Sequence, residues 1–205
     1  MEETLSNDSK IKKMLKSTWD FLSDTFLSTI VVIGVVILIR FILVSPFEVN
    51  GGSMLDTLHD GDYIIVDKIS YRFKDPERGD IIVLVPPTDT DTYYVKRIIG
   101  LPGEEVEFSN GQVLIHNDRY PAGLKLDEPY LNEDNEKTYL PNRIDRTIEV
   151  PSNQYFVMGD NRGGSNDSRQ WGTLHSRNIE GRALIIVLPL RDFGLTQEVD
   201  YGMEE

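Results

Sequence analysis

Apolar and polar residues alternate with a helical period near the start of the chain. From residue 11 to residue 26, apolar residues recur every three or four positions, at Ile11, Met14, Leu15, Trp19, Leu22 and Phe26. This spacing predicts a helix with one apolar face. Because Lys12, Lys13 and Lys16 lie off that face, we expect residues 1–28 to form an amphipathic segment at a membrane surface.

The pattern then becomes continuously apolar. Residues 29–44 read TIVVIGVVILIRFILV, and Phe26 and Leu27 precede them. About 19 helical residues cover roughly 28 Å, close to the thickness of a bilayer's hydrocarbon core. The one charged residue, Arg40, is near the end, where a long side chain reaches the interface. We predict a transmembrane helix over residues 29–45. A cleaved secretory signal is the alternative, but no small-residue cleavage site follows at Ser45-Pro46-Phe47.

The distribution of basic residues predicts the orientation of this span. Lys10, Lys12, Lys13 and Lys16 precede it, whereas no lysine or arginine occurs between Ser45 and Asp67. Since basic residues favour the cytoplasmic side, we expect a single-pass protein of the cytoplasmic membrane. Its N-terminus would be cytoplasmic, and residues 46–195 would form a domain on the outer face.

Short apolar runs dominate the rest of the chain. They lie at 63–66, 81–85, 94–99, 106–108, 113–115, 155–158 and 183–188, with turn residues between them. No helical pattern alternates with them, so we expect a mostly β domain, an antiparallel sandwich or partly closed barrel. Asn110-Gly111 predicts the clearest hairpin. The polar stretch 117–146 is expected to be an inserted surface flap, and 196–205 an acidic, frayed tail.

Composition excludes several classes of function. The chain has 34 acidic and 21 basic residues, a net charge of −13, which argues against a nucleic-acid partner. It has no cysteine, so disulfides and thiolate chemistry are excluded. The histidines, His59, His116 and His175, show no paired metal-ligand spacing, so no metal or other cofactor is expected. A Ser/His hydrolase remains open, because catalytic triads assemble across a fold.

A serine and a lysine are the candidates for catalysis. Gly51-Gly52-Ser53-Met54 places a serine between glycines and shortly after the predicted span. A lysine can activate a serine only if burial lowers its pKa far enough to leave the amine neutral. Lys96 lies inside an apolar strand pattern between Tyr94 and Ile98, whereas Arg97 stays protonated and cannot be a base. Taken alone, Lys96 also fits the edge of an exposed face.

A polar, glycine-rich loop is the third candidate element. Residues 159–172 read GDNRGGSNDSRQWG and directly follow the predicted strand 155–158. Such a composition allows tight turns and close backbone approach, and Trp171 is expected to hold the loop by packing inward.

These three stretches together resemble the bacterial type I signal peptidases, membrane-anchored proteases with a Ser/Lys dyad. The similarity extends from the anchor to about Leu190. Its motifs are SMLDTL followed by GD at 53–62, RGDII at 78–82, YVKRIIGLPG at 94–103 and the complete loop at 159–172. The resemblance implies cleavage of secretory preproteins that carry small residues at positions −1 and −3.

The resemblance also implies residue roles. Ser53 would be the nucleophile and Lys96 the general base. Ser165 would orient the Lys96 amine, Asp167 and Arg169 would form a supporting ion pair, and Gly159 would begin the loop beside the site.

Two positions depart from the family pattern. Gly51 stands where some members have a serine that adds an oxyanion donor. Asp56 stands where the family usually has proline, and a carboxylate there would favour a protonated Lys96 and weaken the base. A non-catalytic, anchored peptide-binding homologue is therefore the alternative function.

Overall fold

The computed structural model describes residues 2–38, 44–55, 57–132, 135, 137–141, 145–196, 199 and 201. The chain divides into two compact units, Met1–Leu43 and Val44–Glu205. Asp56, whose effect on the site is a prediction from the sequence, lies outside the described residues.

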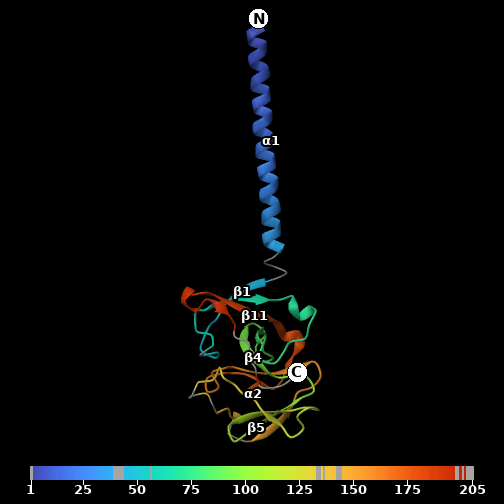
Figure 1. The fold of residues 1–205 in the computed structure, drawn as a ribbon, viewed down its shortest axis with the longest axis vertical. Helices are drawn as coiled ribbons and strands as arrows, with labels where there is room; N and C mark the ends of the chain where they lie inside the picture. Colours follow the sequence, from blue (N-terminus) through green and yellow to red (C-terminus); the bar gives the residue numbers. More distant parts are fainter. Residues whose placement is uncertain are drawn as a thin grey trace. The chain divides into compact units, whose positions relative to one another are not determined.

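The first unit contains one continuous helix. α1 spans Glu2–Leu38, which joins the predicted amphipathic segment to most of the predicted span (Figure 1). In the part of the chain that the structure describes, no helix is both long enough and apolar enough to cross a membrane. The predicted transmembrane helix over 29–45 is therefore not confirmed. Its limit at residue 45 is wrong, because Val44 and Ser45 pair with β2 as part of a strand.

The second unit contains two antiparallel sheets (Figure 1). In the larger sheet the strands follow the order β1-β2-β11-β3-β4-β9-β10, with β12 paired to β11. Their bounds are β1 Val44–Glu48, β2 Tyr63–Asp67, β3 Ile81–Leu84, β4 Tyr94–Gly100, β9 Gln154–Met158, β10 Leu174–His175, β11 Ile179–Leu188 and β12 Gly194–Leu195. Short helical turns connect them: η2 Ser70–Arg72, α2 Ser168–Trp171, η4 Ser176–Asn178 and η5 Leu190–Asp192.

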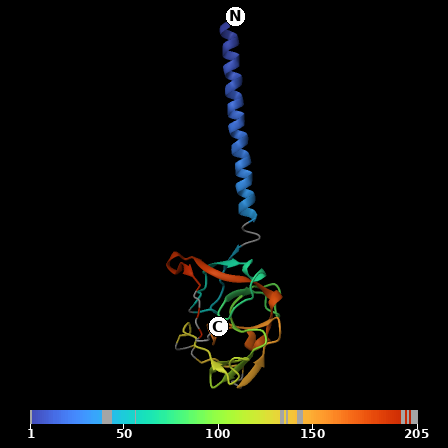
Figure 2. The same ribbon diagram turned by 45° about the vertical axis from the view of Figure 1, so that its right-hand side comes forward.

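The smaller sheet has the order β7-β6-β5-β8. Its strands are β5 Glu105–Ser109, β6 Gln112–His116, β7 Leu124–Lys125 and β8 Arg146–Glu149. Asn110 and Gly111 join β5 to β6 with φ of 52° and 78°, which confirms the predicted hairpin with two left-handed residues. Figure 2 shows the strands curling around the centre of the unit. The prediction of a mostly β, antiparallel domain is confirmed.

The predicted flap is not a solvated loop throughout. Leu126, Tyr130 and Leu140 are buried in the same apolar cluster as Phe108 and Phe156, between the two sheets. Apolar side chains at irregular spacing carry no period that sequence reasoning can detect, although burying them stabilises the fold. The expectation of a surface flap over 117–146 is wrong for these residues.

The predicted frayed tail is also wrong at one residue. Tyr201 is buried, and its ring lies 6.3 Å from that of Tyr130, centroid to centroid. Val199 packs against the same cluster.

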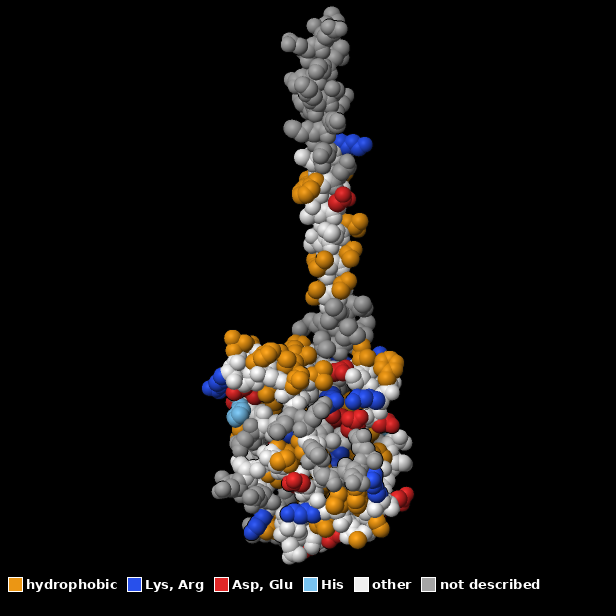
Figure 3. Space-filling model, viewed as in Figure 1, with side chains coloured by type: hydrophobic (Ala, Val, Ile, Leu, Met, Phe, Trp, Pro, Cys, Tyr) orange, Lys and Arg blue, Asp and Glu red, His pale blue; other side chains and the backbone are white. Residues whose placement is uncertain are grey.

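A patch of apolar side chains is exposed at one end of this unit. Figure 3 shows apolar side chains gathered at the end where β1 and β11 lie in Figure 1. The exposed large apolar residues along β2, β11, η5 and β12 are Tyr63, Leu188, Leu190, Phe193 and Leu195. Groups of exposed apolar residues of this kind are typical of interaction surfaces.

Candidate active site

The loop that carries Ser53 is closed at its base and anchored on both sides of the serine. Val49 N–H donates to Asp62 O at 2.8 Å, and Gly61 N–H donates to Val49 O at 2.8 Å. Met54 and Leu58 are buried beneath the loop in one apolar cluster. Because its neighbours are held in this way, Ser53 occupies a defined position at the surface of the β unit.

The backbone before the serine requires glycine. Gly51 has φ of 91°, a left-handed conformation that side chains disfavour, and its N–H donates to Asp60 Oδ1 at 2.6 Å. Gly51 therefore shapes the turn that presents Ser53.

Lys96 lies within hydrogen-bond distance of Ser53. On β4, its side chain is only 3% exposed, and Nζ donates to Ser53 Oγ at 2.8 Å and to Val95 O at 2.7 Å. Nζ is also 5.1 Å from the centre of the Tyr94 ring. The interpretation of Lys96 as the edge of an exposed face is wrong, because its side chain is buried.

Burial lowers the pKa of Lys96 from its ordinary value of 10.5 to about 8. The desolvation of the charged amine is the main cause, and the negative charges of Asp167 and Asp160 partly oppose it. An amine with this pKa is neutral in a substantial fraction of molecules near neutral pH.

The glycine-rich loop lies against the nucleophile loop at Gly159. A Cβ on Gly159 would lie 2.3 Å from Ser53 O and 2.3 Å from Ser165 Oγ, so only glycine fits there. Asn161, two residues after Gly159, contacts the same loop. Its backbone N–H donates to Ser53 O at 3.1 Å, and its side-chain Nδ2 donates to Gly52 O at 2.9 Å. The two loops are thus joined through the backbone beside the serine.

Ser165 lies beside Gly159, but its predicted hydrogen bond is not found. Its side chain is buried, with 8% exposed, and among the described residues Oγ makes no hydrogen bond of ordinary geometry, although it lies close enough to the Asp167 carboxylate to help lower its pKa. The structure brings Ser165 near the site without a bond to Lys96. Trp171 packs inward against an apolar cluster, as expected from the sequence.

Asp167 and Arg169 form the ion pair that the sequence suggested. Arg169 Nη2 lies 2.7 Å from Asp167 Oδ2, and Gly159 N–H donates to the same oxygen at 3.0 Å. Burial raises the pKa of Asp167, but the hydrogen bond and charge of Arg169 outweigh it, so this pKa lies below its ordinary value. The carboxylate therefore holds the start of the loop in place.

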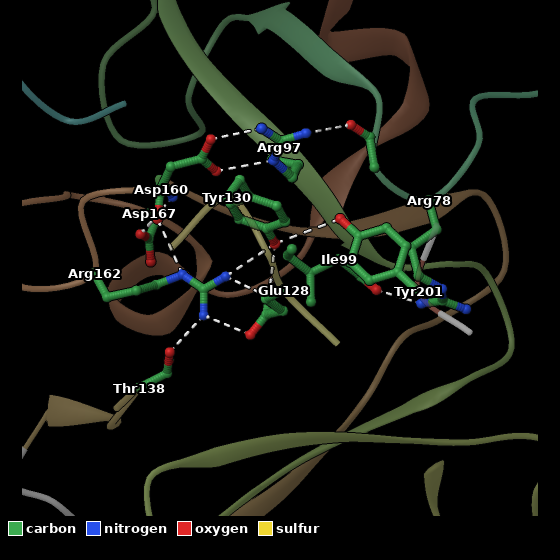
Figure 4. Close-up of polar contacts among 12 residues, drawn as sticks. Arg78, Arg97, Ile99, Glu128, Tyr130, Thr138, Asp160, Arg162, Asp167 and Tyr201 are labelled. Carbon is green, nitrogen blue, oxygen red and sulfur yellow. Dashed lines mark hydrogen bonds and ion pairs between the residues drawn. The ribbon is translucent and has the colours of Figure 1, made fainter. Parts of the chain in front are cut away.

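Sequence reasoning missed a second, deeper ion pair. Arg97 is 0% exposed and Asp160 is 1% exposed, and Arg97 Nη2 lies 2.6 Å from Asp160 Oδ2 (Figure 4). Thr57 Oγ1 donates to the same carboxylate oxygen at 2.5 Å. This network joins the strand of Lys96, the nucleophile loop and the glycine-rich loop. The available signal was an arginine inside an apolar strand, which needs a partner when buried.

A third arginine ties the 117–146 region to the same loop. Arg162 is buried and pairs with Glu128, and it also donates to Thr138 (Figure 4). Its pKa is raised above its ordinary value, because the charge of Glu128 outweighs the cost of burial. This pairing explains why so polar a stretch packs inward.

Ser53 and Lys96 open onto a groove of about 570 Å³. Residues 47–54 form one wall, residues 91–96 form the other, and Val83, Gly164 and Asn166 complete it. No histidine is among the described residues that line this groove. The Ser/His alternative therefore gains no support, since His116 pairs with Glu107 and His175 accepts from Arg177 N–H elsewhere on the β unit.

A serine that accepts a hydrogen bond from a buried lysine, at the side of a groove, is typical of a serine peptidase. The family model of signal peptidase, peptidase S26, matches residues 22–188. The chain belongs to this family, and it is accordingly a serine endopeptidase.

Two relatives agree with this assignment in sequence. The chain is 38% identical to a probable signal peptidase I-1 of Synechocystis sp., over 88% of this chain and 89% of the relative. It is 39% identical to signal peptidase I S of Bacillus subtilis, over 81% of this chain and 90% of the relative. A crystal structure of a signal peptidase I from Enterococcus faecalis is 32% identical and covers 53% of this chain and 97% of its own, with a TM-score of 0.42.

Proposed function

We propose that this chain removes N-terminal signal peptides from secretory preproteins, with Ser53 as nucleophile and Lys96 as general base. The observation that carries the proposal is the 2.8 Å separation between Lys96 Nζ and Ser53 Oγ, together with the burial that lowers the lysine pKa. Ser165, Asp167, Arg169 and Gly159 support the site by holding the loop that contacts the nucleophile.

In the first step, neutral Lys96 Nζ accepts the proton of Ser53 Oγ while Oγ bonds to the scissile carbonyl carbon. The carbonyl oxygen becomes an oxyanion that requires hydrogen-bond donors. The Ser53 N–H makes no hydrogen bond among the described residues, so it is available for this purpose. Gly51 adds no side-chain donor.

The tetrahedral adduct then breaks down to an ester-linked acyl-enzyme, which water hydrolyses in a second stage. The C–N bond breaks, the leaving amine takes the proton from Lys96 Nζ, and the signal peptide remains attached to Ser53 as an ester. Lys96 then accepts a proton from water, whose oxygen attacks the ester carbonyl. Release of the acid returns the proton to Ser53 Oγ and regenerates the enzyme.

The groove accounts for the expected substrate. Phe47 and Glu48 at the end of β1 and residues 94–96 at the start of β4 are the extended parts of its two walls, so a substrate in β conformation can pair with them. Residues −1 and −3 of such a strand point to the same face, because side chains alternate. We infer that these two residues point toward the floor near Met54, Val83 and Val95, where small side chains fit.

We further propose that the apolar run that begins at residue 29 and ends before the strand residues Val44 and Ser45 anchors the protein in the cytoplasmic membrane, and that the bilayer is a partner of the β unit. The apolar run of 29–44 and the lysines before it support this arrangement. So does the exposed apolar patch that includes Leu190, Phe193 and Leu195. Residues 1–28 would then be cytoplasmic, and the β unit from Val44 onward would form the peptidase domain on the outer face.

Cleavage of a preprotein with small residues at −1 and −3 tests the catalytic proposal. The full chain in detergent should cleave it, while Ser53→Ala and Lys96→Ala should lower kcat/KM by at least about 10²–10⁴-fold. Lys125→Ala is the matched control, because Lys125 is an exposed lysine on a strand. Equal inertness of wild type and both site variants would support the peptide-binding alternative instead. Abolition by His59→Ala or His175→Ala, with Lys96→Ala active, would support the Ser/His alternative.

The absence of cysteine allows a clean test of topology. Ser6→Cys reports on the N-terminal segment, and Asp118→Cys reports on an exposed residue of the β unit. In intact cells stripped of their wall, a membrane-impermeant maleimide should label only Asp118→Cys. Labelling of Ser6→Cys alone, or of both variants equally, would contradict the proposed orientation.

A further inference from the structure

A histidine and two aspartates converge on the β unit outside the groove. His59 and Asp62 lie at the end of the loop between β1 and β2, and Asp192 ends η5, between β11 and β12. One potential ligand atom from each of the three lies within 4.8 Å of the other two. The sequence showed no such grouping, because Asp192 is remote from the other two along the chain.

The central carboxylate is buried, and no lysine or arginine is paired with it among the described residues. Asp62 is 1% exposed, and its Oδ2 accepts the N–H of His59 at 2.8 Å. The His59 ring Nδ1 lies 3.9 Å from the same oxygen. Among the described residues, Asp62 Oδ1 accepts no hydrogen bond, and the His59 ring is the one potentially cationic group paired with this carboxylate. A buried carboxylate normally has a cation or several donors to offset its desolvation.

The two remaining groups are accessible to an ion from solvent. The His59 and Asp192 side chains are about half and about a quarter exposed. Asp192 Oδ2 pairs with Arg191 at 3.1 Å, which leaves Asp192 Oδ1 for another partner. The half-exposed ring of His59 can rotate to bring a nitrogen toward both carboxylates.

The donor set indicates the class of ion. One imidazole nitrogen and two carboxylate oxygens suit a divalent transition metal such as Zn²⁺, with water completing the coordination. In a tetrahedral site with ligand distances near 2.1 Å, donors lie about 3.4 Å apart. The observed separations, of up to 4.8 Å, exceed this spacing, so the side chains must rotate to bring the donors together around an ion. Ca²⁺ fits less well, because it prefers six to eight oxygens.

We propose that His59, Asp62 and Asp192 form a divalent transition-metal site that cross-links the nucleophile loop to the β11–β12 turn. The bound ion neutralises the buried Asp62 carboxylate. It also joins the base of the loop, where Asp62 O accepts from Val49 N–H, to a segment far away in sequence. The site is structural, and it lies apart from Ser53 and Lys96.

Titration of the full chain with Zn²⁺ by isothermal calorimetry tests this site, after removal of any affinity tag. Wild type should bind one ion per chain. His59→Ala and Asp192→Asn should each weaken the Kd by at least about tenfold, since even the loss of an outer partner has that effect. His116→Ala is the matched control, because His116 also lies beside a carboxylate, 2.6 Å from Glu107, and its loss should leave the binding unchanged.

Zn²⁺ should also raise the Tm of wild type and of His116→Ala, but not of His59→Ala or Asp192→Asn. Circular dichroism checks that each variant is folded. Mg²⁺ and Ca²⁺ at the same concentrations should produce a smaller rise. The proposal is overturned if wild type binds no ion with one-to-one stoichiometry. It is also overturned if His59→Ala and Asp192→Asn bind Zn²⁺ as wild type does. Neither readout depends on preprotein cleavage, so this proposal and the proposed function can fail separately.

Discussion

The pH dependence of cleavage depends directly on the burial of Lys96. The base must be neutral, and its pKa of about 8 lies well below the ordinary 10.5. At pH 7 roughly one molecule in ten then carries a neutral amine, compared with about one in 3,000 for an unperturbed lysine. Burial therefore raises the fraction of neutral Lys96 at pH 7 about 300-fold. This corresponds to about 3.4 kcal/mol of destabilisation of the charged amine, at 1.36 kcal/mol per pH unit.

We therefore expect kcat/KM for preprotein cleavage to rise about tenfold per pH unit below pH 8 and to level off above it. The assay requires a peptide substrate without titratable groups near its cleavage site, assayed from pH 5.5 to pH 10. Lys125→Ala should show the same profile, because Lys125 is exposed and outside the groove. An inflection at or above pH 10 would mean that burial does not lower the lysine pKa. An inflection near pH 6.5 would point to a histidine base.

Three other predictions concern stability and packing. Lys96→Met should raise the free energy of unfolding at pH 7 by about 2 kcal/mol: relief of the depressed pKa contributes up to about 3.4 kcal/mol, and lost hydrogen bonding subtracts about 1 kcal/mol. Because the native pKa is lowered, this gain is complete below about pH 8 and fades as the pH rises toward 10.5. Asp160→Asn leaves the buried Arg97 without its charged partner and should lower the free energy of urea unfolding by about 3–5 kcal/mol. Gly159→Ala should lower kcat/KM by at least about 100-fold, since the added Cβ displaces the nucleophile's carbonyl and the Ser165 hydroxyl.

Each of these predictions has a distinct contrary outcome. A gain in Lys96→Met that is as large at pH 10.5 as at pH 7 would show that it does not arise from ionisation. A nearly neutral Asp160→Asn would mean that the Arg97 guanidinium finds other acceptors. Rescue of Gly159→Ala by a second change, Ser165→Ala, would show that the hydroxyl alone obstructs, whereas we expect no rescue because the backbone carbonyl is equally close.

Local patterns predicted the regular elements well. Alternating apolar residues around Asn110-Gly111 predicted the β5–β6 hairpin, because the left-handed conformations of both turn residues favour this dipeptide. The same reasoning made Ser53 and Lys96 candidates, the family resemblance implied their roles, and the two side chains lie 2.8 Å apart. Whether they act together in cleavage stays a prediction.

The polar core of the β unit was not accessible to such reasoning. Arg97 looked like an ordinary strand residue and Asp160 like a loop residue, although they form a buried ion pair. Tyr201 and Tyr130 were assigned to exposed segments, although both are buried. In each case the stabilising partner lies in another element, and period and propensity carry no information about such a partner.

The amino-acid sequence by itself determined the class of fold, the position of the turns and the identity of the two candidate catalytic groups. These follow from interactions between near neighbours: alternation within strands, glycine in left-handed turns and a lysine inside an apolar run. Only the tertiary structure decided that Lys96 is buried, that Gly159 lies against the Ser53 carbonyl and that Asp62 meets Asp192. These depend on desolvation and close packing between segments far apart in sequence, which exist only once the sheets have formed.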